Sequence, residues 1–389
     1  MRILVDYRPA LRTRSGVGEW VHQLSRAILA AVHTDQPAAR DVELTLFTAS
    51  WSDRPDPDAI RELEGAAVVD RRVPTRPLTW IWSRFDWPPI ERLARQPIDL
   101  VLSPTPLSVP TRHAANAITI HDLDFLDHPG RASGEMKHVD HRLTGRHAAR
   151  ADLVVAVSAY TAGVVRDRLH LPPERIVVCR AGVPGWLAGG SAPRRGPSGG
   201  EYILFVGTLE PRKNVPALLD AYGLLLARGP GPPLVLAGRL AESPRAWEPR
   251  LRSLPPWGRV DLRGYVAERE KPALYRGAAM LVLPSFEEGF GLPALEAMAM
   301  GVPVVASRVG AIPEVVGDAA LLVPPGDARA LSDAMSRVLS EPGLASELHA
   351  RGLRRSRDFD WMTSACSLLE SFRTVVARRS GKLAGGGRP

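Results

Sequence analysis

Residues 279–307 restrict the fold more than any other part of the chain, because they join two apolar runs through an acidic glycine-rich loop. Residues 280–283 and 302–306 have the short apolar or β-branched character of buried strands, and residues 292–300 between them favour a helix. Pro293 suits the first turn of that helix, and Gly301 suits its C-terminal cap. A strand, a helix and a strand in this order predict a parallel sheet covered by helices.

The loop of this βαβ unit carries the chemistry. Glu288 lies in the loop and Glu296 lies on the helix that follows, so two carboxylates are expected near the carboxyl end of a strand, where ligands bind in open α/β sheets. Residues 289–292, which are Gly289, Phe290, Gly291 and Leu292, let backbone amides approach a ligand closely. The alternative is a pair of solvated glutamates on a surface connection, and the glycines favour the binding site.

The length of 389 residues predicts two domains, and the 45% hydrophobic and 24% charged content is that of a globular chain. We expect an N-terminal domain over residues 1–183, a Gly/Pro-rich linker over 184–200, a second domain over 201–360, a final helix over 361–378 and a disordered tail over 379–389. No apolar run reaches the length of a membrane span, and the N-terminus does not resemble a secretory signal. A cytoplasmic location is the default expectation.

The net charge of +8 comes from basic residues that are nearly all Arg and are spread along the chain. This distribution, without a known nucleic-acid module, argues against nucleic-acid binding. Anionic substrates and peripheral contact with an anionic membrane, at its inner face, are compatible with it. Cys179 and Cys366 are too few for a disulfide framework or a cysteine-based zinc site.

The first half of the chain opens with a strand over residues 2–7, a loop that carries Gly16 and Gly18, and a helix from about residue 19. The glycines lie too far from the strand for a dinucleotide fingerprint, so NAD binding is disfavoured. Two interpretations stay equally open: a loop whose backbone approaches a sugar or phosphate, and a merely mobile turn. A helix is also expected over residues 132–149.

Four aromatic residues lie close together between residues 78 and 90: Trp80, Trp82, Phe85 and Trp87. They could contact an acceptor or a membrane interface. Packing of a helix on the sheet is the favoured interpretation.

His121 ends a predicted strand over residues 117–121, which places it at the carboxyl edge of the sheet beside Asp122. A functional role as an acid or base and a purely structural role are equally supported by this position. Asp122 and Asp124 form a D-x-D pattern that can hold a divalent cation, but no further carboxylate motif supports a metal site.

The second half opens with a strand over residues 202–206 that runs into the sequence GTLEPRKN. Asn214 can cap a helix that starts at Val215, so Arg212 and Lys213 lie just before a helix N-terminus. Two cations and free backbone amides in this position can together hold a diphosphate.

Residues 207–214 and 285–301 together resemble glycosyltransferase family 4 (GT4, glycosyl transferases group 1), whose members are retaining enzymes that use nucleotide sugars. The segments that carry the resemblance are GTLEPRKN, SFEEGFGLPALEAMAMG, the GVGEW loop and IHDLDFLDHP, and the similarity extends over nearly the whole chain. It implies an α/β GT-B fold, in which two Rossmann-like domains face each other across a cleft and a C-terminal helix crosses back to the N-terminal domain. The donor is then expected on the second domain and the acceptor on the first.

The resemblance also implies a role for each matching residue. Lys213 matches the lysine on the donor diphosphate, with Arg212 beside it, and Glu288 matches the glutamate near the transferred sugar. Many members carry an arginine directly after Gly207, where this chain has Thr208, so Arg212 is expected to supply that charge. The remaining matches are Phe290 to Leu292 for amides on the sugar hydroxyls, Glu296 for the nucleotide ribose, His121 for the sugar, and Gly16 and Gly18 for the phosphates.

The expected function is transfer of a hexosyl group, with mannosyl from GDP-mannose as the first candidate, to a hydroxyl of a glycan, a lipid-linked saccharide or a metabolite. The nucleotide sugar is a co-substrate, and no cofactor or metal is expected. A GT-B sugar-nucleotide epimerase and a non-catalytic GT-B partner or glycan-binding protein stay open. A pyridoxal-dependent phosphorylase is disfavoured, because the chain has few lysines and none has a clear aldimine setting.

Overall fold

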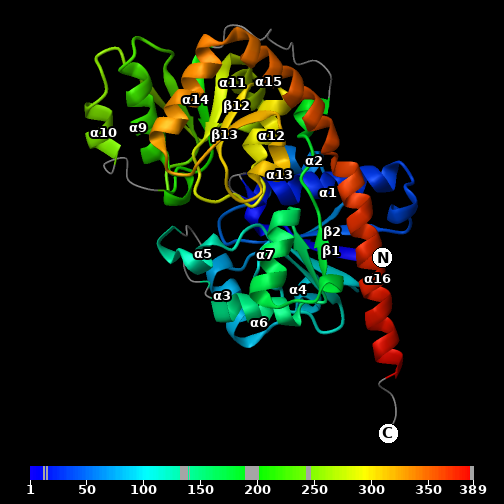
Figure 1. The fold of residues 1–389 in the computed structure, drawn as a ribbon. Coiled ribbons are helices and arrows are strands. Elements are labelled where there is room, and N and C mark those ends of the chain that lie inside the picture. Colours follow the sequence, from blue (N-terminus) through cyan, green and yellow to red (C-terminus); the bar gives the residue numbers. More distant parts are fainter. Residues whose placement is uncertain are drawn as a thin grey trace. The chain divides into compact units, whose positions relative to one another are not determined.

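The protein is described by a computed structural model, which covers residues 1–11, 14, 16–131, 139, 141–188, 201–241 and 247–385, with side chains to residue 381. The chain forms two compact units. Unit 1 comprises Met1–Leu123, Val139–Gly182 and Asp360–Pro389, and unit 2 comprises Asp124–His138 and Val183–Phe359. Each unit contains one parallel sheet with helices around it (Figure 1).

Unit 1 is built on a seven-stranded parallel sheet in the order β3-β2-β1-β4-β5-β6-β7. Its strands β1, β4 and β6 are buried along almost their whole length, as expected where helices cover both faces of a sheet. The strands are β1 Arg2–Asp6, β2 Glu43–Ala49, β3 Ala67–Arg71, β4 Leu100–Ser103, β5 Ala115–Ile120, β6 Leu153–Ala156 and β7 Ile176–Val178. The helices are α1 Val17–His33, α2 Pro57–Arg61, α3 Thr75–Phe85, α4 Ile90–Ala94, α6 His141–Arg150, α7 Ala159–Leu169 and α16 Trp361–Gly385.

Unit 2 is built on a six-stranded parallel sheet in the order β10-β9-β8-β11-β12-β13. The strands are β8 Tyr202–Val206, β9 Leu234–Ala237, β10 Val260–Gly264, β11 Ala278–Leu283, β12 Val304–Ser307 and β13 Ala320–Val323. The helices are α5 Asp124–Asp127, α8 Gly185–Ala188, α9 Val215–Leu226, α10 Glu248–Arg252, α11 Lys271–Gly277, α12 Leu292–Ala299, α13 Ile312–Val316, α14 Ala328–Ser340 and α15 Pro342–Arg355.

The βαβ unit predicted over residues 279–307 is confirmed. β11 pairs in parallel with β12, and α12 lies between them in the chain. Pro293 occupies the first turn of α12, and Gly301 follows its C-terminal cap with φ of 71°. Proline is tolerated there because its missing N–H would have no helical partner, and glycine enters the left-handed region without strain. The acidic loop therefore lies at the carboxyl end of β11.

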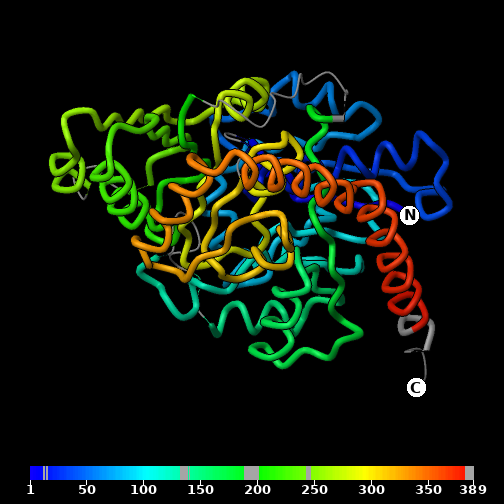
Figure 2. The backbone as a smooth tube through the Cα atoms, turned by 45° about the horizontal axis from the view of Figure 1, so that its top comes forward, coloured from blue at the N-terminus to red at the C-terminus, as the bar shows by residue number. Residues whose placement is uncertain are grey.

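The last helix, α16, packs on α1 within unit 1. Figures 1 and 2 both show this red C-terminal helix beside the N-terminal end of the chain. It continues to Gly385, so the prediction that the helix ends at residue 378 is wrong. A helix that can pack an apolar stripe against a neighbour extends past the point where its own sequence becomes polar.

Two further expectations need correction or fall outside the description. The helix expected over residues 132–149 is α6, His141–Arg150, while residues 132–138 and 140 lie outside the described residues. The expected linker over 184–200 contains the short helix α8, and its residues 189–200 lie outside the described residues, as do residues 386–389 of the expected tail. Among the described residues, no helix has both the length and the hydropathy to cross a bilayer.

The four aromatics between residues 78 and 90 do not share one environment. Trp82 is buried on the sheet beside Phe47, as the packing interpretation predicts. Trp80, Phe85 and Trp87 are 61%, 62% and 57% exposed, so the packing interpretation is wrong for these three. Trp80 lies two residues before Trp82 and therefore points away from the face of α3 that packs on the sheet, and Trp87 lies beyond Phe85, the last residue of α3.

Candidate functional site

The predicted site residues fall into two sets, one in each unit. Gly16, Gly18 and His121 belong to unit 1, and the other predicted residues belong to unit 2. The set in unit 2 lies where β8 and β11 end, and these strands are neighbours in the sheet. Parallel strands bring their carboxyl ends to one edge, which is why residues near 210 and near 288 meet.

The loop after β8 presents the two cations. Gly207 and Thr208 leave the strand, and Pro211–Lys213 form a short 3-10 helix directly before α9. α9 begins at Val215 as predicted, but Asn214 does not cap it. Asn214 has a left-handed backbone with φ of 51°, and its side-chain amide donates to the Pro284 carbonyl at 3.2 Å. Asn214 therefore ties the cationic loop to the start of the acidic loop.

Lys213 and Glu288 form a buried ion pair. The Lys213 Nζ donates to both carboxylate oxygens of Glu288, at 2.7 and 2.8 Å, and the Ser285 hydroxyl donates to Oε1 at 2.7 Å. Glu288 is only 4% exposed. An ammonium has three N–H donors, so one donor of Lys213 stays without a partner among the described residues.

Arg212 supports the same loop. Its Nη1 donates to the Glu287 carbonyl at 2.9 Å, its Nη2 donates to Glu210 at 3.0 Å, and Nη1 lies 3.8 Å from Glu288 Oε2. Arg212 thus adds positive charge near Glu288, but its guanidinium is shared with Glu210. Burial would raise the pKa of Glu288, but the charges of Lys213 and Arg212 and the hydrogen bonds from Lys213 and Ser285 outweigh burial, and the pKa lies below its ordinary value.

A second loop holds the acidic loop in place. Gly310 has φ of 53°, and a Cβ at this position would lie 2.2 Å from the Glu288 carbonyl oxygen. That oxygen accepts from the Ala311 N–H at 2.8 Å. Only glycine allows this approach. The loop that contains Gly310 and Ala311 therefore holds the backbone of Glu288 in position.

The rest of the loop leads into α12. Phe290 is buried edge-on against Phe359, with ring centroids 5.8 Å apart. Gly291 precedes α12 with φ of 95°, and Leu292 is the first residue of the helix. The predicted backbone amides of this segment are therefore present at a helix N-terminus.

Glu296 lies in a different cluster, on the buried side of α12. Its carboxylate accepts from Lys271 Nζ at 2.7 Å and from the Tyr275 hydroxyl at 2.5 Å. Trp186 stacks on Tyr275, with centroids 6.2 Å apart and an interplanar angle of 16°. Burial and the charge of Glu296 raise the pKa of Tyr275, so the hydroxyl stays a donor. Glu288 and Glu296 thus bind different cations and do not form an acid–base pair.

Sequence reasoning missed Lys271, Tyr275 and Ser285. Lys271 and Tyr275 are one helical turn apart on α11, so the i, i+4 spacing shows that they share a face. Nothing in the sequence showed that this face meets Glu296. Ser285 lies three residues before Glu288, which is a spacing that a turn can close.

In unit 1, His121 directly follows β5, as predicted. Its Nε2 lies 3.1 Å from the Pro104 carbonyl oxygen, and because a carbonyl can only accept, Nε2 carries the proton. The Trp20 indole meets the imidazole edge-on, with centroids 5.4 Å apart. These two contacts fix the tautomer and the orientation of the ring, and no pattern in the sequence predicted that Trp20 lies beside it.

The two glycines near the N-terminus differ. Gly16 precedes α1 with φ of 52°. Gly18 lies in the first turn of α1, where a Cβ would come within 2.7 Å of the Pro9 carbonyl oxygen. The expectation that both belong to one loop is wrong for Gly18, which is needed for close packing of α1.

The D-x-D pattern does not form a cluster of ligands. Asp124 is buried and accepts from His128 at 2.9 Å and from Arg131 at 3.4 Å. In the described part of the chain, no group of three or more His, Cys, Asp or Glu side chains could hold a metal ion.

Comparison with known proteins identifies the family of the chain. A model described as "Glycosyltransferase Family 4" matches residues 15–184, and one described as "Glycosyl transferases group 1" matches residues 200–341. The chain is 32% identical over 276 residues to the O-antigen chain mannosyltransferase B of Escherichia coli. The aligned region covers 69% of this chain and 72% of that protein. The chain belongs to glycosyltransferase family 4. It is therefore a glycosyltransferase with the GT-B fold, as the resemblance implied.

Solved structures of GT-B enzymes share the fold. Sucrose-phosphate synthase from Thermosynechococcus elongatus aligns with a TM-score of 0.72 and 23% identity, over 97% of this chain and 99% of that one. The Anabaena protein HepE in complex with UDP-glucose aligns with a TM-score of 0.65 and 18% identity, over 99% and 100%. At these identities the likeness concerns the fold alone.

Proposed function

We propose that this GT4 protein is a retaining glycosyltransferase that transfers a hexosyl group from a nucleotide sugar to a hydroxyl acceptor. The observation that carries the proposal is the Lys213–Glu288 pair at the carboxyl ends of β8 and β11, with Arg212 beside it. At this edge of the parallel sheet, Lys213 has one N–H donor without a partner among the described residues, and the carboxylate of Glu288 is held by hydrogen bonds. This is the combination that departure of a nucleoside diphosphate needs.

The chemistry follows from the charges. When the bond between the sugar C1 and the diphosphate breaks, negative charge develops on the leaving phosphate and positive charge develops on the sugar ring. Lys213 and Arg212 stabilise the phosphate, so we propose that no metal is required. Glu288, held ionised by its cations, stabilises the positive sugar. The acceptor oxygen bonds C1 on the face that the diphosphate leaves, and the acceptor proton passes to the leaving diphosphate.

We propose for the remaining residues the roles that the resemblance to family 4 implies. Glu296 is held by Lys271 and Tyr275 at a fixed angle, which suits a carboxylate that accepts from ribose hydroxyls. The amides of residues 290–292 suit hydroxyls of the sugar. His121, with its ring oriented by Pro104 and Trp20, suits a contact to the sugar from the first domain, and Gly16 suits a close approach of backbone to a phosphate.

GDP-mannose is the first candidate donor, because the relative from Escherichia coli is named as a mannosyltransferase. UDP-glucose is the second, because HepE of the same fold was solved with it. A glycan, a lipid-linked saccharide and a metabolite stay as acceptor classes.

A screen of GDP-, UDP-, ADP- and dTDP-sugars tests the proposal. We expect one nucleotide sugar to raise the thermal stability of the protein, since a ligand of the native state stabilises it by mass action. The same donor should be transferred or slowly hydrolysed, and NMR of the product should show the anomeric configuration of the donor. If no sugar nucleotide is bound, hydrolysed or transferred, the enzyme proposal is wrong.

The same screen separates the alternatives. An epimerase would convert the donor sugar without an acceptor, which product analysis of the acceptor-free reaction detects. A non-catalytic partner would bind a glycan without turning over any donor. The intact Lys213–Glu288 pair argues against the second alternative, because a scaffold has no need to keep a buried ion pair in a loop.

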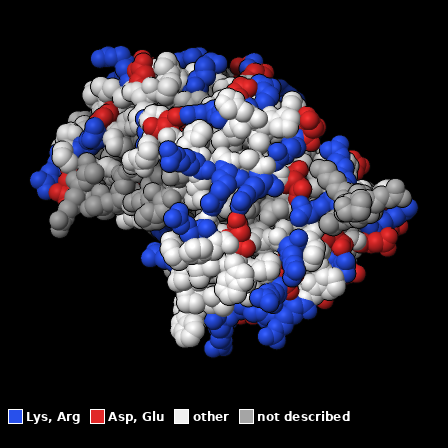
Figure 3. Space-filling view, turned by 90° about the horizontal axis from the view of Figure 1, so that it is seen from below, with Lys and Arg blue, Asp and Glu red and all other residues white. Residues whose placement is uncertain are grey.

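We also propose peripheral contact with an anionic membrane through the exposed face of α3. Trp80 and Phe85 lie together on this face, with centroids 5.6 Å apart. Arg76 and Arg84 are exposed on the same helix, which contains no Asp or Glu. Aromatic rings and arginines without carboxylates suit a bilayer interface with anionic lipids. Figure 3, seen from the side on which α3 and α6 are drawn in Figure 1, shows more Lys and Arg than Asp and Glu.

Vesicle co-sedimentation tests the membrane contact. We expect binding to phosphatidylglycerol-containing vesicles and weaker binding to phosphatidylcholine alone. Replacement of Trp80 and Phe85 by Ser should weaken it, whereas Trp257→Ser, at a site in unit 2 that is 48% exposed, should not. Equal binding of all three proteins would exclude α3 as the contact. The cytoplasmic location stays a prediction.

A further inference from the structure

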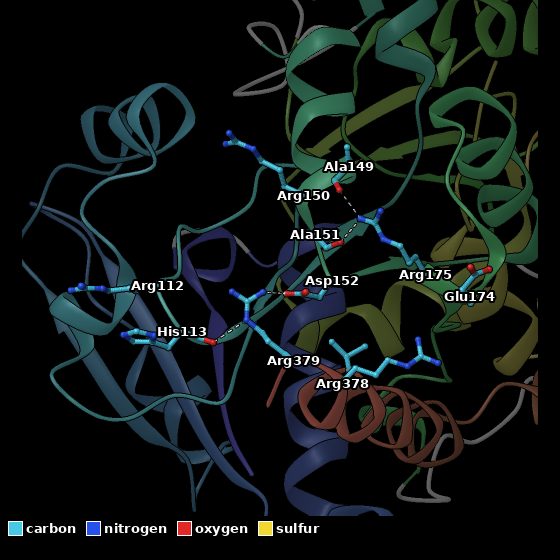
Figure 4. A pocket seen from close by; sticks show the side chains of 11 residues that line it. Arg112, His113, Ala149, Arg150, Ala151, Asp152, Glu174, Arg175, Arg378 and Arg379 are labelled. Atoms are coloured by element: carbon cyan, nitrogen blue, oxygen red, sulfur yellow. Dashed lines mark hydrogen bonds and ion pairs between the residues drawn. The ribbon is translucent and has the colours of Figure 1, made fainter. Parts of the chain in front are cut away.

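A pocket of about 580 Å³ lies in unit 1, and no predicted function of the chain uses it (Figure 4). Its walls come from the residues just before β5, β6 and β7, namely Arg112, His113, residues 149–152, Glu174 and Arg175, and from α16. It therefore opens at the amino-terminal edge of the sheet. His121 follows the other end of β5, so about 20 Å of strand separates the pocket from the predicted acceptor side.

Two guanidinium groups are fixed inside the pocket. Arg379 of α16 donates Nε to the His113 carbonyl at 3.0 Å and Nη1 to Asp152 at 2.7 Å. Arg175 donates Nη2 to the carbonyls of Ala148 and Ala149 at 2.9 Å each, and also to that of Ala151. Figure 4 shows both guanidinium groups within the cavity. Each keeps N–H groups without a partner among the described residues, namely Nη2 of Arg379 and Nε and Nη1 of Arg175.

The rim of the pocket is also cationic. Arg112 and Arg378 have no ion-pair partner within the part of the chain that the structure describes, and Figure 4 shows their side chains extending outward. An arginine side chain rotates about several bonds, so both can turn to a bound anion. Arg150 is paired with Asp86 at 2.5 Å. Five arginines line the pocket, but its acidic lining residues are only Asp152, which is paired with Arg379, and Glu174.

We propose that this pocket binds a phosphate-bearing anion. Unpaired guanidinium N–H groups at fixed positions recognise phosphate oxygens through charge-assisted hydrogen bonds. Such an anion would join Arg378 and Arg379 of α16 to Arg112 and Arg175 of the strand loops, and so hold the end of α16 on the sheet. The chemistry is shared by free phosphate, by a phosphorylated metabolite and by a lipid headgroup, and the experiment separates free phosphate from lipid.

The experiment measures the binding of inorganic phosphate and pyrophosphate to the full-length protein by calorimetry at constant ionic strength. The pocket variant carries Arg112→Ala and Arg378→Ala, two exposed residues without ion-pair partners among the described residues, so it should fold. The control variant carries Arg329→Ala and Arg354→Ala, which remove the same charge from exposed sites in unit 2. Lys213→Ala removes the proposed donor-phosphate contact and serves as a third protein.

We expect both anions to bind the unmodified protein, the control and Lys213→Ala. In the Lys213→Ala background, which lacks the proposed donor-phosphate contact, the two pocket substitutions should weaken binding at least about tenfold, because the pocket loses two charge-assisted hydrogen bonds. Loss of binding in Lys213→Ala with full binding in the pocket variant would assign the anion to the donor site and overturn the proposal. Absence of binding in the unmodified protein would also overturn it. This outcome is independent of the proposed transferase activity, since no sugar nucleotide is used.

A vesicle arm identifies the source of the anion. Phosphatidylglycerol vesicles that bind the control but not the pocket variant would assign a lipid headgroup to the pocket. Vesicle binding that is equal in both variants, together with the loss of phosphate binding in the pocket variant, would assign a free phosphate compound. Phosphate and vesicle binding that are both unchanged in the pocket variant would contradict the proposal.

Discussion

At the scale of single residues, Lys213 and Glu288 depend on each other because both are buried. Their side chains are 11% and 6% exposed, so neither charge is well solvated by water. Glu288 accepts from three side-chain donor hydrogens, two of them on Lys213. Removal of one partner of a buried pair leaves the other charge without compensation. The pair is therefore a structural contact as well as a candidate catalytic one.

We predict that Lys213→Met lowers the free energy of unfolding by about 3–5 kcal/mol, because Glu288 then stays buried without its main counter-charge. Transfer activity should fall by about two orders of magnitude or more, as the diphosphate loses a preorganised cation. Chemical denaturation measures the first effect and steady-state kinetics the second.

The double variant Lys213→Met with Glu288→Gln is the control for this prediction. It removes both charges, so part of the lost stability should return while activity stays low. A single variant as stable as the unmodified protein would show that Glu288 finds another partner, and would contradict the importance of the pair for stability.

At the scale of elements, the conformation of the acidic loop depends on its close contact with Gly310, which lies in the loop after β12. A Cβ at Gly310 would overlap the Glu288 carbonyl oxygen and approach the Glu288 nitrogen to 2.9 Å. We predict that Gly310→Ala displaces the acidic loop and lowers kcat about 100-fold, because catalysis tolerates little misplacement of reacting groups. Steady-state kinetics with the identified donor would measure this loss.

Gly326→Ala is the matched control. Gly326 also has a left-handed backbone, with φ of 76°, but the nearest atom to an added Cβ is Phe286 Cε1 at 3.7 Å. The strain of the left-handed backbone should lower the free energy of unfolding of this variant by about 1–2 kcal/mol, as in Gly310→Ala, but most of the activity should remain. Equal kcat losses in the two variants would mean that strain alone, and not the position of Glu288, explains the effect.

The order of helices and strands could be predicted well from the sequence. The side-chain contacts around Glu288 and Glu296 could be predicted less well. The strand, loop and helix around Glu288 follow from apolar runs, Pro293 and Gly301, which are local signals. The contacts of Lys271 and Tyr275 with Glu296, and of Gly310 with Glu288, depend on which elements become neighbours after folding. The Asn214 side chain shows the same limit: it fits a helix cap, but the carbonyl of Pro284 binds it instead.

The helix α6 contributes a pH-sensitive contact to unit 1. His147 is buried, and its Nδ1 accepts from the Ser108 N–H and is 2.7 Å from the Ser108 hydroxyl. Burial, with the charges of Arg146 and Arg150, lowers the pKa of His147 to about 4. In the unfolded chain the imidazole takes up a proton near pH 6.5. The unfolded state therefore binds more protons between these two values.

We predict that the free energy of unfolding falls as the pH drops from 6.5 to 4, with His147 contributing about 3 kcal/mol of the loss. Chemical denaturation at a series of pH values measures this slope. His147→Gln should reduce it, whereas His141→Gln, at an exposed position of the same helix, should leave it unchanged. An unreduced slope in His147→Gln would assign the acid sensitivity to other groups.

At the scale of the whole molecule, unit 1 is completed by the last segment of the chain. Phe372 of α16 is fully buried, and α16 packs on α1. Arg373 donates to the Ala38 carbonyl at 3.1 Å and also to that of Arg40, while Arg379 bonds Asp152 before β6. Part of the core of unit 1 is thus buried by α16, which is distant in sequence from the rest of the unit, whereas unit 2 is almost continuous in sequence. The two units should therefore differ in what destabilises them.

We predict that Phe372→Ala destabilises unit 1 by about 3–5 kcal/mol, the usual cost of removing a buried aromatic ring, and leaves unit 2 largely unchanged. Hydrogen exchange followed by mass spectrometry should show faster exchange in β1–β7 and unchanged exchange in β8–β13. Phe205→Ala, at a fully buried position in β8, should show the opposite pattern. Equal acceleration in both units by either variant would mean that the chain unfolds as one cooperative body, because destabilisation of one unit would then be transmitted to the other.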